Sequence, residues 1–417
     1  MNRFLIASGC ANFGDGVALV AWGWLATQLT RDPLWIAMVP VALKAPWFVF
    51  SLPAGIIVDR LDRRRLMMAA DGLRALAYLI AGLAVWFTLP LTDAPLRGTD
   101  YPALFALIAA CAVVVGLAEV LRDTAAQTML PALVPPDDLE RANARLWTIE
   151  IVMNTGLGTA AAGVLLGLSL ALPFGVNAAA MALAVALMAT IAGQYRAQPA
   201  TPPARASWRA ELREGIGFLL ANPTLRQLAL LTGFFNFAFE AVMVSLVLIV
   251  QERLEMGPLA LSAIMMAGAA GGVLAGLTGE RIIARLGRGR TLQWVMLFAL
   301  PLPLMIWLAG PGIWGVALVA LGFFISELGG VLWNTIVVAW RQRLVPPALL
   351  GRVNSAYRLF AIGMAPVGML AAGLLIRAVG DGFGRGTGLI APSVMAFLVM
   401  GLLTLAYWRF LHRAFGH

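Results

Sequence analysis

Histidine, cysteine and charged residues are all scarce in this sequence, and each shortage excludes a class of protein. The two histidines, His412 and His417, both lie at the C-terminal end, so histidine-based catalysis and histidine metal sites are not expected. The two cysteines, Cys10 and Cys111, are isolated within apolar segments, which argues against a disulfide framework or a cysteine metal site. Neither a Walker-type phosphate loop nor a glycine-rich dinucleotide motif occurs. We therefore expect no metal, no cofactor and no ATP-driven step, and we expect that the chain is not an enzyme.

Long apolar segments make up most of the sequence, and charged residues are few. Only 12% of the 417 residues are charged and 61% are apolar, whereas soluble globular chains are about 25% charged and about 45–50% apolar. The net charge of +9 is then a sign of membrane topology and not of nucleic-acid binding. The pattern predicts an all-α integral membrane protein with twelve transmembrane helices. They lie near residues 4–28, 34–58, 66–90, 102–125, 145–167, 171–193, 226–250, 258–281, 291–309, 312–338, 354–378 and 388–410.

The arginines set the orientation of these helices. If both termini are cytoplasmic, most arginines fall on the inner side, where positive charge is retained. The outer loops then hold Arg31, Arg97, Arg253, Arg377 and Arg385. We expect a multi-pass protein of the plasma or inner membrane with both termini inside.

One long polar connection, residues 195–225, separates two sets of six predicted helices. Its first half is rich in proline and alanine and is typical of a linker. Its second half, about 207–221, has helical spacing and mixed charge, which predicts a short amphipathic helix on the cytoplasmic surface. We expect an N-terminal lobe at 1–194 and a C-terminal lobe at 226–417.

The two lobes share sequence at equivalent positions, which indicates parallel repeats. Two-lobed secondary transporters are built this way, with the substrate site between the lobes near the midplane. The matched pairs are LVPPDDLERANA (133–144) with LVPPALLGRVNSA (344–356), GIIVDR (55–60) with GLTGER (276–281), and GCANF (9–13) with GFFNF (233–237).

GIIVDRLDRRR at 55–65 resembles the loop signature of the major facilitator superfamily, with a glycine, an Asp-Arg pair and further basic residues. It departs from that signature at Asp62, where a glycine is usual. Further segments resemble the branch of the superfamily that contains the enterobactin exporter and the macrolide efflux proteins. These segments are Asn12-Phe-Gly-Asp15, 135–143, Arg213-Glu-Gly215, Asn222-Pro223 and Leu350-Gly-Arg-Val-Asn354. The likeness covers nearly the full chain and implies a monomeric exporter of small molecules.

The resemblance also implies that the 55–65 loop forms a latch on the inner side, which holds the lobes in the outward-facing state. Gly55 permits close helix contact, and Asp59 lies where it would meet the positive N-terminus of another helix. We expect the basic residues to pair with Asp123 or Glu150; the alternative is that they only fix topology. The basic latch residues are Arg60, Arg63 and Arg64, and the second-half copy is Glu280 and Arg281.

Several ionisable residues fall inside predicted helices, where each costs roughly 2.5–3.5 kcal/mol and suggests a functional role. They are Asp15, Lys44, Glu119, Glu150, Glu240, Glu327 and Arg358. Asp15 and Lys44, the only lysine, both fall near the midplane of adjacent helices, so an ion pair is expected. That pair is either structural or part of a proton acceptor site.

Glu240 lies among Phe234, Phe235, Phe237 and Phe239, and such apolar surroundings favour proton binding or recognition of a cationic lipophilic substrate. The alternative is a hydrogen bond to Asn236 one turn away.

Glu327 is a similar candidate, with Trp333 and Asn334 one to two turns on. Trp47 is a deep aromatic residue that is suited to a hydrophobic substrate. Asp71 with Arg74, and Glu119 with Arg122, have the i,i+3 spacing of structural pairs within one helix.

These observations predict a proton-coupled antiporter of amphipathic or lipophilic small molecules that works by alternating access of two lobes. The resemblance implies the outward direction of transport, as in multidrug efflux transporters. A dedicated exporter of one metabolite, such as a siderophore, and a lipid carrier are the alternatives within transport. A membrane sensor or scaffold that transports nothing is the alternative from another class.

Overall fold

A computed structural model describes residues 1–135, 138–193, 195, 208–346 and 349–416. Over these residues the regular structure is helical, without a β-sheet, and twelve helices are long and apolar enough to cross a membrane. The predicted all-α integral membrane fold is therefore confirmed. The described chain divides into two compact units: unit 1 comprises Met1–Thr201 with Gly257–Ser262, and unit 2 comprises Pro202–Met256 with Ala263–His417.

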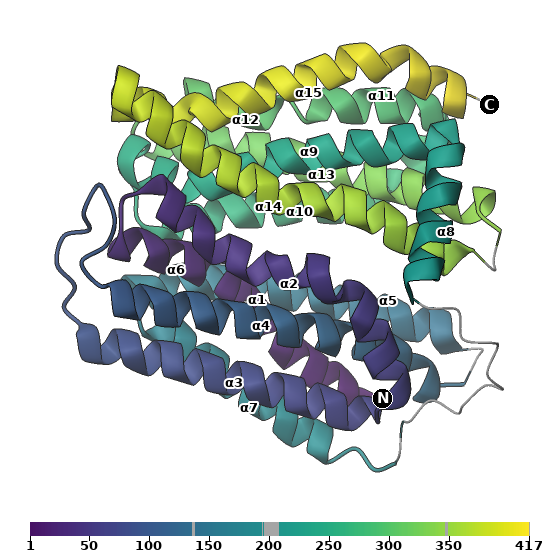
Figure 1. The fold of residues 1–417 in the computed structure, drawn as a ribbon, viewed down its shortest axis with the longest axis horizontal. Coiled ribbons are helices and arrows are strands. Elements are labelled where there is room, and N and C mark those ends of the chain that lie inside the picture. Colours follow the sequence, from purple (N-terminus) through teal and green to yellow (C-terminus); the bar gives the residue numbers. More distant parts are fainter. Residues whose placement is uncertain (136–137, 194, 196–207, 347–348, 417) are drawn as a thin grey trace. The chain divides into compact units, whose positions relative to one another are not determined.

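The N-terminal half of the chain supplies six membrane-crossing segments (Figure 1). The fifth segment is continuous through α5, a π-helical stretch and α6. The helices are α1 (Asn2–Leu29), α2 (Pro33–Arg60), α3 (Arg63–Thr88), α4 (Pro102–Met129), the short 3-10 turn Leu130–Ala132, α5 (Leu139–Glu150), the π-helix Ile151–Gly158, α6 (Thr159–Leu168) and α7 (Leu172–Ala189).

The C-terminal half supplies another six, preceded by the shorter helix α8. The ninth segment is broken into α11 and α12 just before Pro301, a residue that cannot donate a backbone hydrogen bond. The helices are α8 (Trp208–Ala221), α9 (Pro223–Leu248), the π-helix Ile249–Arg253, α10 (Pro258–Leu286), α11 (Arg288–Phe298), α12 (Pro301–Leu308), α13 (Ile313–Leu344), α14 (Leu350–Phe383) and α15 (Arg385–Phe415).

Side-chain caps fix where several of these helices begin. The Asp62 carboxylate accepts from the Arg65 backbone N–H at 2.9 Å, which caps α3. Its second oxygen accepts from the Tyr195 N–H at 2.7 Å. Asn222 caps α9 in the same way, accepting from the Leu225 N–H at 3.0 Å, with Pro223 in the first turn. The carboxylate at position 62, which departs from the family signature, therefore has a structural role.

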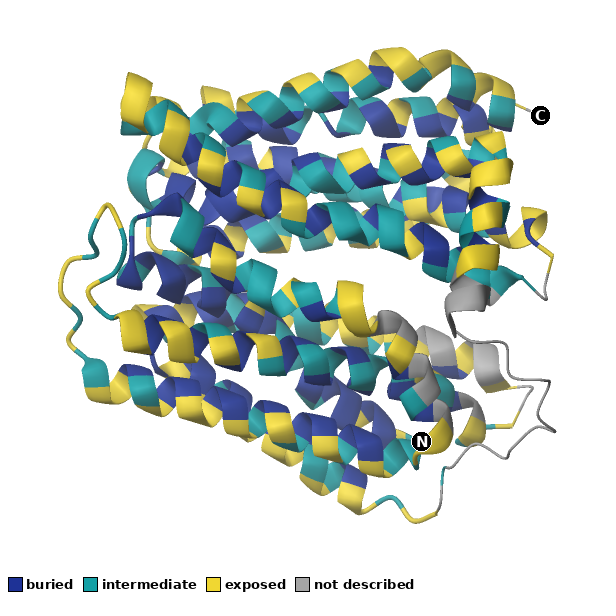
Figure 2. Cartoon of the chain, in the orientation of Figure 1, coloured by how far each residue is buried: buried dark blue, intermediate teal, exposed yellow. Residues whose placement is uncertain are grey.

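Most helices present one face to protein and another to the surroundings (Figure 2). Leu398, Leu402 and Leu405 of α15 are all exposed at helical spacing. Exposed leucines in such a row are expected of a helix that faces lipid, because lipid tails solvate apolar side chains.

Glycines set equivalent helix contacts in the two units. A Cβ atom on Gly116 of α4 would lie 2.1 Å from the Leu43 carbonyl oxygen of α2. A Cβ atom on Gly271 of α10 would lie 2.1 Å from the Phe324 carbonyl oxygen of α13. The second and fourth segments of one half therefore touch as the second and fourth of the other half do. The helices that follow the repeated LVPP motifs also begin at matching positions, Leu139 and Leu350.

Gly271→Ala is expected to lower the free energy of unfolding by about 1–3 kcal/mol, because the added methyl group overlaps backbone that cannot move freely. Gly276→Ala on the same helix is the matched control, since a Cβ atom there meets nothing within 4 Å. Thermal unfolding of both variants in detergent checks this expectation. Equal stability of the two variants would contradict it.

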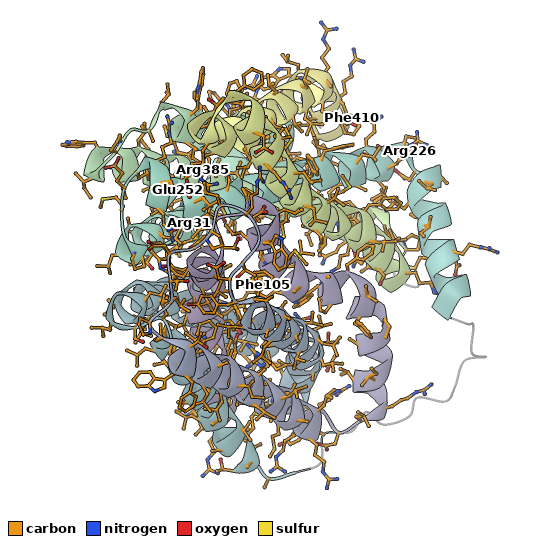
Figure 3. All side chains as sticks on the ribbon, turned by 60° about the vertical axis from the view of Figure 1, so that its left-hand side comes forward. Arg31, Phe105, Arg226, Glu252, Arg385 and Phe410 are labelled. Carbon is orange, nitrogen blue, oxygen red and sulfur yellow. The ribbon has the colours of Figure 1, made fainter. Side chains whose placement is uncertain are left out.

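Two ion pairs tie helix ends together within unit 2. At one end, Arg385 of α15 donates from Nε and Nη2 to the two carboxylate oxygens of Glu252, at 2.5 and 2.7 Å (Figure 3). At the other, Arg352 of α14 donates to Glu214 of α8 at 2.5 Å. Gly215 of α8 lies directly against the Arg352 carbonyl oxygen. The two segments used for the branch resemblance, 213–215 and 350–354, are thus in contact.

Candidate functional site

Five charged residues of α1, α3 and α4 form a continuous ion-pair network in unit 1. Arg74 donates to Asp15 and also to Asp71 Oδ1, the latter at 3.3 Å. Nε of Arg122 lies 3.6 Å from the same Asp71 oxygen. Nη1 of Arg122 donates to Asp123 at 3.3 Å. We call these five residues the unit 1 ion-pair network; acid and base alternate along it.

The three central residues of this network are buried, and the two terminal residues are partly exposed. The side chains of Arg74, Asp71 and Arg122 are 0%, 1% and 4% exposed. Asp15 is 15% exposed and Asp123 is 34% exposed. Because a buried charge is tolerated only when it is paired, each inner residue depends on its neighbours in the network.

The partners within this network differ from those expected from the sequence. Asp15 pairs with Arg74 of α3, where Lys44 was the expected partner. Arg122 contacts Asp71 and Asp123, where Glu119 was the expected partner. The i,i+3 contact between Asp71 and Arg74 does form, but it is one link of a network across three helices. Spacing along one helix cannot reveal which neighbouring helix supplies a closer partner.

Glu119 is half-buried beside the network. Its charge interacts with those of Arg74, Lys44 and Arg122. Lys44 itself is exposed and Trp47 is half-buried. Glu150 is exposed at the end of α5, and its charge interacts with those of Asp123 and Arg122.

The predicted latch residues have diverse surroundings. Arg64 donates from Nε to the Met188 carbonyl at 2.9 Å and from Nη2 to the Ala189 carbonyl at 2.6 Å. It therefore caps the last turn of α7, where a cation is favoured, and the expected pairing with Asp123 or Glu150 is replaced by this contact. Arg60 is exposed and Arg63 is half-buried.

Gly55 and Asp59 lie within α2, but outside the residues whose side chains the structure describes. Glu280 and Arg281, the second-half copy of the latch, are both exposed near the end of α10.

Unit 2 brings two of the predicted acids together. Glu240 of α9 and Glu327 of α13 are both half-buried, and their charges interact. Phe239 immediately precedes Glu240, and Phe323 lies one turn before Glu327. The rings of these two phenylalanines stack with centroids 6.2 Å apart. Gly268 of α10 leaves room for this arrangement, since a Cβ atom there would lie 2.2 Å from the Phe323 ring and 3.1 Å from the Glu327 stem. We call Glu240 and Glu327 the unit 2 acidic pair.

The other predicted residues of unit 2 lie elsewhere. Asn236 donates to the Ala361 carbonyl of α14 at 2.7 Å, which ties α9 to α14, whereas the alternative considered for Glu240 was a hydrogen bond to Asn236. Trp333 is half-buried against an apolar cluster. Asn334 and Arg358 are exposed.

One residue of interest was not singled out from the sequence. Arg341 was counted only among the inner-side arginines that set topology, yet it is 8% exposed near the end of α13. Its guanidinium lies 4.2 Å from the centre of the Tyr357 ring. Tyr357 in turn is fixed by Thr232 at 2.7 Å and donates to the Leu228 carbonyl at 3.2 Å. No pattern in the sequence distinguishes this arginine from its neighbour Arg343.

Comparison with known proteins gives a consistent result over nearly the whole chain. The Major Facilitator Superfamily description matches residues 4–367. The multidrug efflux pump Tap of Mycolicibacterium fortuitum is 28% identical over 404 residues, which cover 90% of this chain and 89% of Tap. The enterobactin exporter EntS of Escherichia coli is 26% identical over 385 residues, covering 89% of this chain and 85% of EntS.

Solved structures share the fold. A point mutant of the nucleoside transporter NupG superposes with a TM-score of 0.75 at 13% identity, covering 98% of both chains. A bacterial homologue of the iron transporter ferroportin, in an inward-facing state, superposes with a TM-score of 0.69 at 18% identity, covering 96% of both chains. At such low identity these likenesses concern the fold alone.

Proposed function

This chain belongs to the Major Facilitator Superfamily, and we propose that it is a proton-coupled exporter of amphipathic or lipophilic small molecules that works by alternating access. Transport of a small molecule across a membrane is the common activity of this family and of the relatives named above. The outward direction and the drug-efflux type of substrate are proposed from the likeness to Tap and EntS.

The proposal of proton coupling rests on the unit 2 acidic pair. Glu327 and Glu240 carry carboxyl groups, which can take up and release a proton, and both are half-buried near the stacked rings of Phe239 and Phe323. We propose that the pair takes up a proton and releases it when its surroundings change during transport. We propose Glu327, assisted by Glu240, as the proton-binding group.

We propose that the unit 1 ion-pair network holds α1, α3 and α4 in position during transport. Arg74 holds α1 to α3 through Asp15, and Asp71 and Arg122 hold α3 to α4. A network of this kind keeps three helices together as one body while the lobes move. Asp15, the more exposed partner of Arg74, remains the second candidate for a proton acceptor.

The remaining roles of predicted residues follow from the family. We propose that Asp59 and Arg60, with Glu280 and Arg281 as the weaker copy, form the inner latch, and that Lys44 and Trp47 line the substrate pathway. We also propose that the chain has two lobes, 1–194 and 226–417, joined by the cytoplasmic linker 195–225. We propose that it is a monomer in the plasma or inner membrane, with both termini inside.

A second candidate is a dedicated exporter of one metabolite, favoured by the likeness to EntS along 85% of that protein. The two candidates share the fold and the coupling but differ in breadth of substrate.

Transport by proteoliposomes under a controlled pH gradient tests the proposal. A panel of cationic, neutral and anionic amphipathic compounds is added, and internal pH and compound uptake are followed. We expect several panel compounds to accumulate against their own gradient only while the pH gradient lasts. Accumulation of a single metabolite from a cell extract and of no panel compound would favour the dedicated exporter. Uptake that equilibrates without regard to the pH gradient would contradict proton coupling.

A further inference from the structure

Three arginines are buried in membrane-spanning helices of the described chain, and their surroundings differ. Arg74 and Arg122 each contact carboxylates of the unit 1 ion-pair network. Among the described residues, no carboxylate forms an ion pair with Arg341, although its side chain is 8% exposed. Its Nε is buried and has no hydrogen-bond partner there.

The contact with Tyr357 does not replace a carboxylate. The guanidinium carbon lies over the Tyr357 ring, 4.2 Å from its centre. That interaction recovers only part of the hydration that a buried cation loses. A contact with the ring uses no N–H donor in a conventional hydrogen bond, and Nε has no such partner among the described residues, so the donors of Arg341 can receive a planar anion.

A second positive charge and a fixed ring complete the surroundings. The charge of Arg358, on α14 one residue after Tyr357, interacts with that of Arg341. Tyr357 is held by Thr232 and by the Leu228 carbonyl of α9, so the ring that orients Arg341 is itself rigid.

We propose that Arg341 is an anion-binding residue in unit 2, which receives a carboxylate or phosphate group. Arg341 lies three residues before the end of α13 and Tyr357 seven residues after the start of α14, so the site is close to the ends of both helices. In the proposed orientation this is the cytoplasmic end. The anion is the acidic group of an amphipathic substrate that arrives from the cytoplasm, or the phosphate of an inner-leaflet lipid. As a statement about substrate, the inference rests on the proposed export function.

Binding of 1-naphthoate and of 1-naphthamide to the purified full chain in phosphatidylcholine nanodiscs tests the site, because the two probes differ chiefly in charge. We expect the wild type to prefer the naphthoate. Arg341→Gln is expected to weaken naphthoate binding at least about tenfold and to leave naphthamide binding unchanged. Arg343→Gln, an exposed arginine of the same helix, is the matched control and is expected to bind both probes as the wild type does.

A second set of nanodiscs, with phosphatidylglycerol added, distinguishes the two sources of the anion. If the added lipid competes with naphthoate in the wild type but not in Arg341→Gln, the bound anion is a lipid phosphate. If it does not compete, the bound anion is the acidic group of a substrate.

Equal affinity of the wild type for the two probes would overturn the proposal without any variant, and so would a folded Arg341→Gln that binds naphthoate as the wild type does. Arg341→Lys keeps the charge, and it provides a folded comparison if the glutamine variant does not fold. These measurements need no pH gradient. Loss of the anion site and loss of proton coupling are therefore distinguishable.

Discussion

Glu327→Gln is expected to abolish proton-coupled transport, lowering substrate-dependent proton movement to the level of protein-free liposomes. Glutamine has nearly the same shape as glutamate but neither binds nor releases a proton. The Phe239–Phe323 stack and the fit against Gly268 should therefore survive the change. Internal pH and substrate uptake, measured together in proteoliposomes, check this result.

Two comparisons sharpen this prediction. Glu255→Gln is the matched control, because Glu255 is exposed outside the membrane-spanning segments, and it is expected to transport normally. Glu240→Gln removes the other member of the acidic pair and is expected to weaken coupling without abolishing it. A Glu327→Gln variant that still accumulates substrate at the expense of the pH gradient would show that the proton binds elsewhere.

Asp71→Ala is expected to lower the free energy of unfolding by about 3–5 kcal/mol, the cost of leaving buried charges without a partner. Asp71 is 1% exposed and, within the part of the chain that the structure describes, is the one carboxylate that contacts both Arg74 and Arg122. Without it, the contacts between α3 and α4 lose their central link. Thermal or denaturant unfolding in detergent measures the loss.

Asp93→Ala provides the comparison for this variant, because Asp93 is exposed in the loop before α4 and its removal should change stability little. If Asp71→Ala and Asp93→Ala unfold alike, the unit 1 ion-pair network does not hold the helices together as described.

The helices were predictable because hydropathy is a local property of the sequence. The predicted spans 66–90 and 226–250 correspond to α3 (Arg63–Thr88) and to α9 with its π-helical end (Pro223–Arg253). The repeats were visible for a related reason, since the two copies of the LVPP motif precede helices that begin at equivalent leucines. The break in the ninth segment at Pro301 and the π-helix Ile151–Gly158 were not foreseen, because hydropathy does not report backbone hydrogen bonding.

The candidate site was predictable as a set of residues but not as a set of contacts. Asp15, Glu240 and Glu327 stood out because ionisable residues are rare in membrane helices. The partner of each acidic residue depends on how the neighbouring helices are rotated about their axes. The sequence of a single helix does not reveal that rotation. Arg74 therefore replaced Lys44 as the partner of Asp15. Arg341 was missed because an arginine at a helix end is usually explained by topology.

Proton release on substrate binding tests the central claim most directly. The purified protein in weakly buffered detergent is mixed with a transported compound, and a pH indicator reports the protons released per protein for the wild type, Glu327→Gln and Asp15→Asn. We predict that the wild type and Asp15→Asn release protons and that Glu327→Gln binds the compound without releasing any. Release by Glu327→Gln together with its loss in Asp15→Asn would contradict the assignment to the acidic pair and place the proton on the unit 1 ion-pair network.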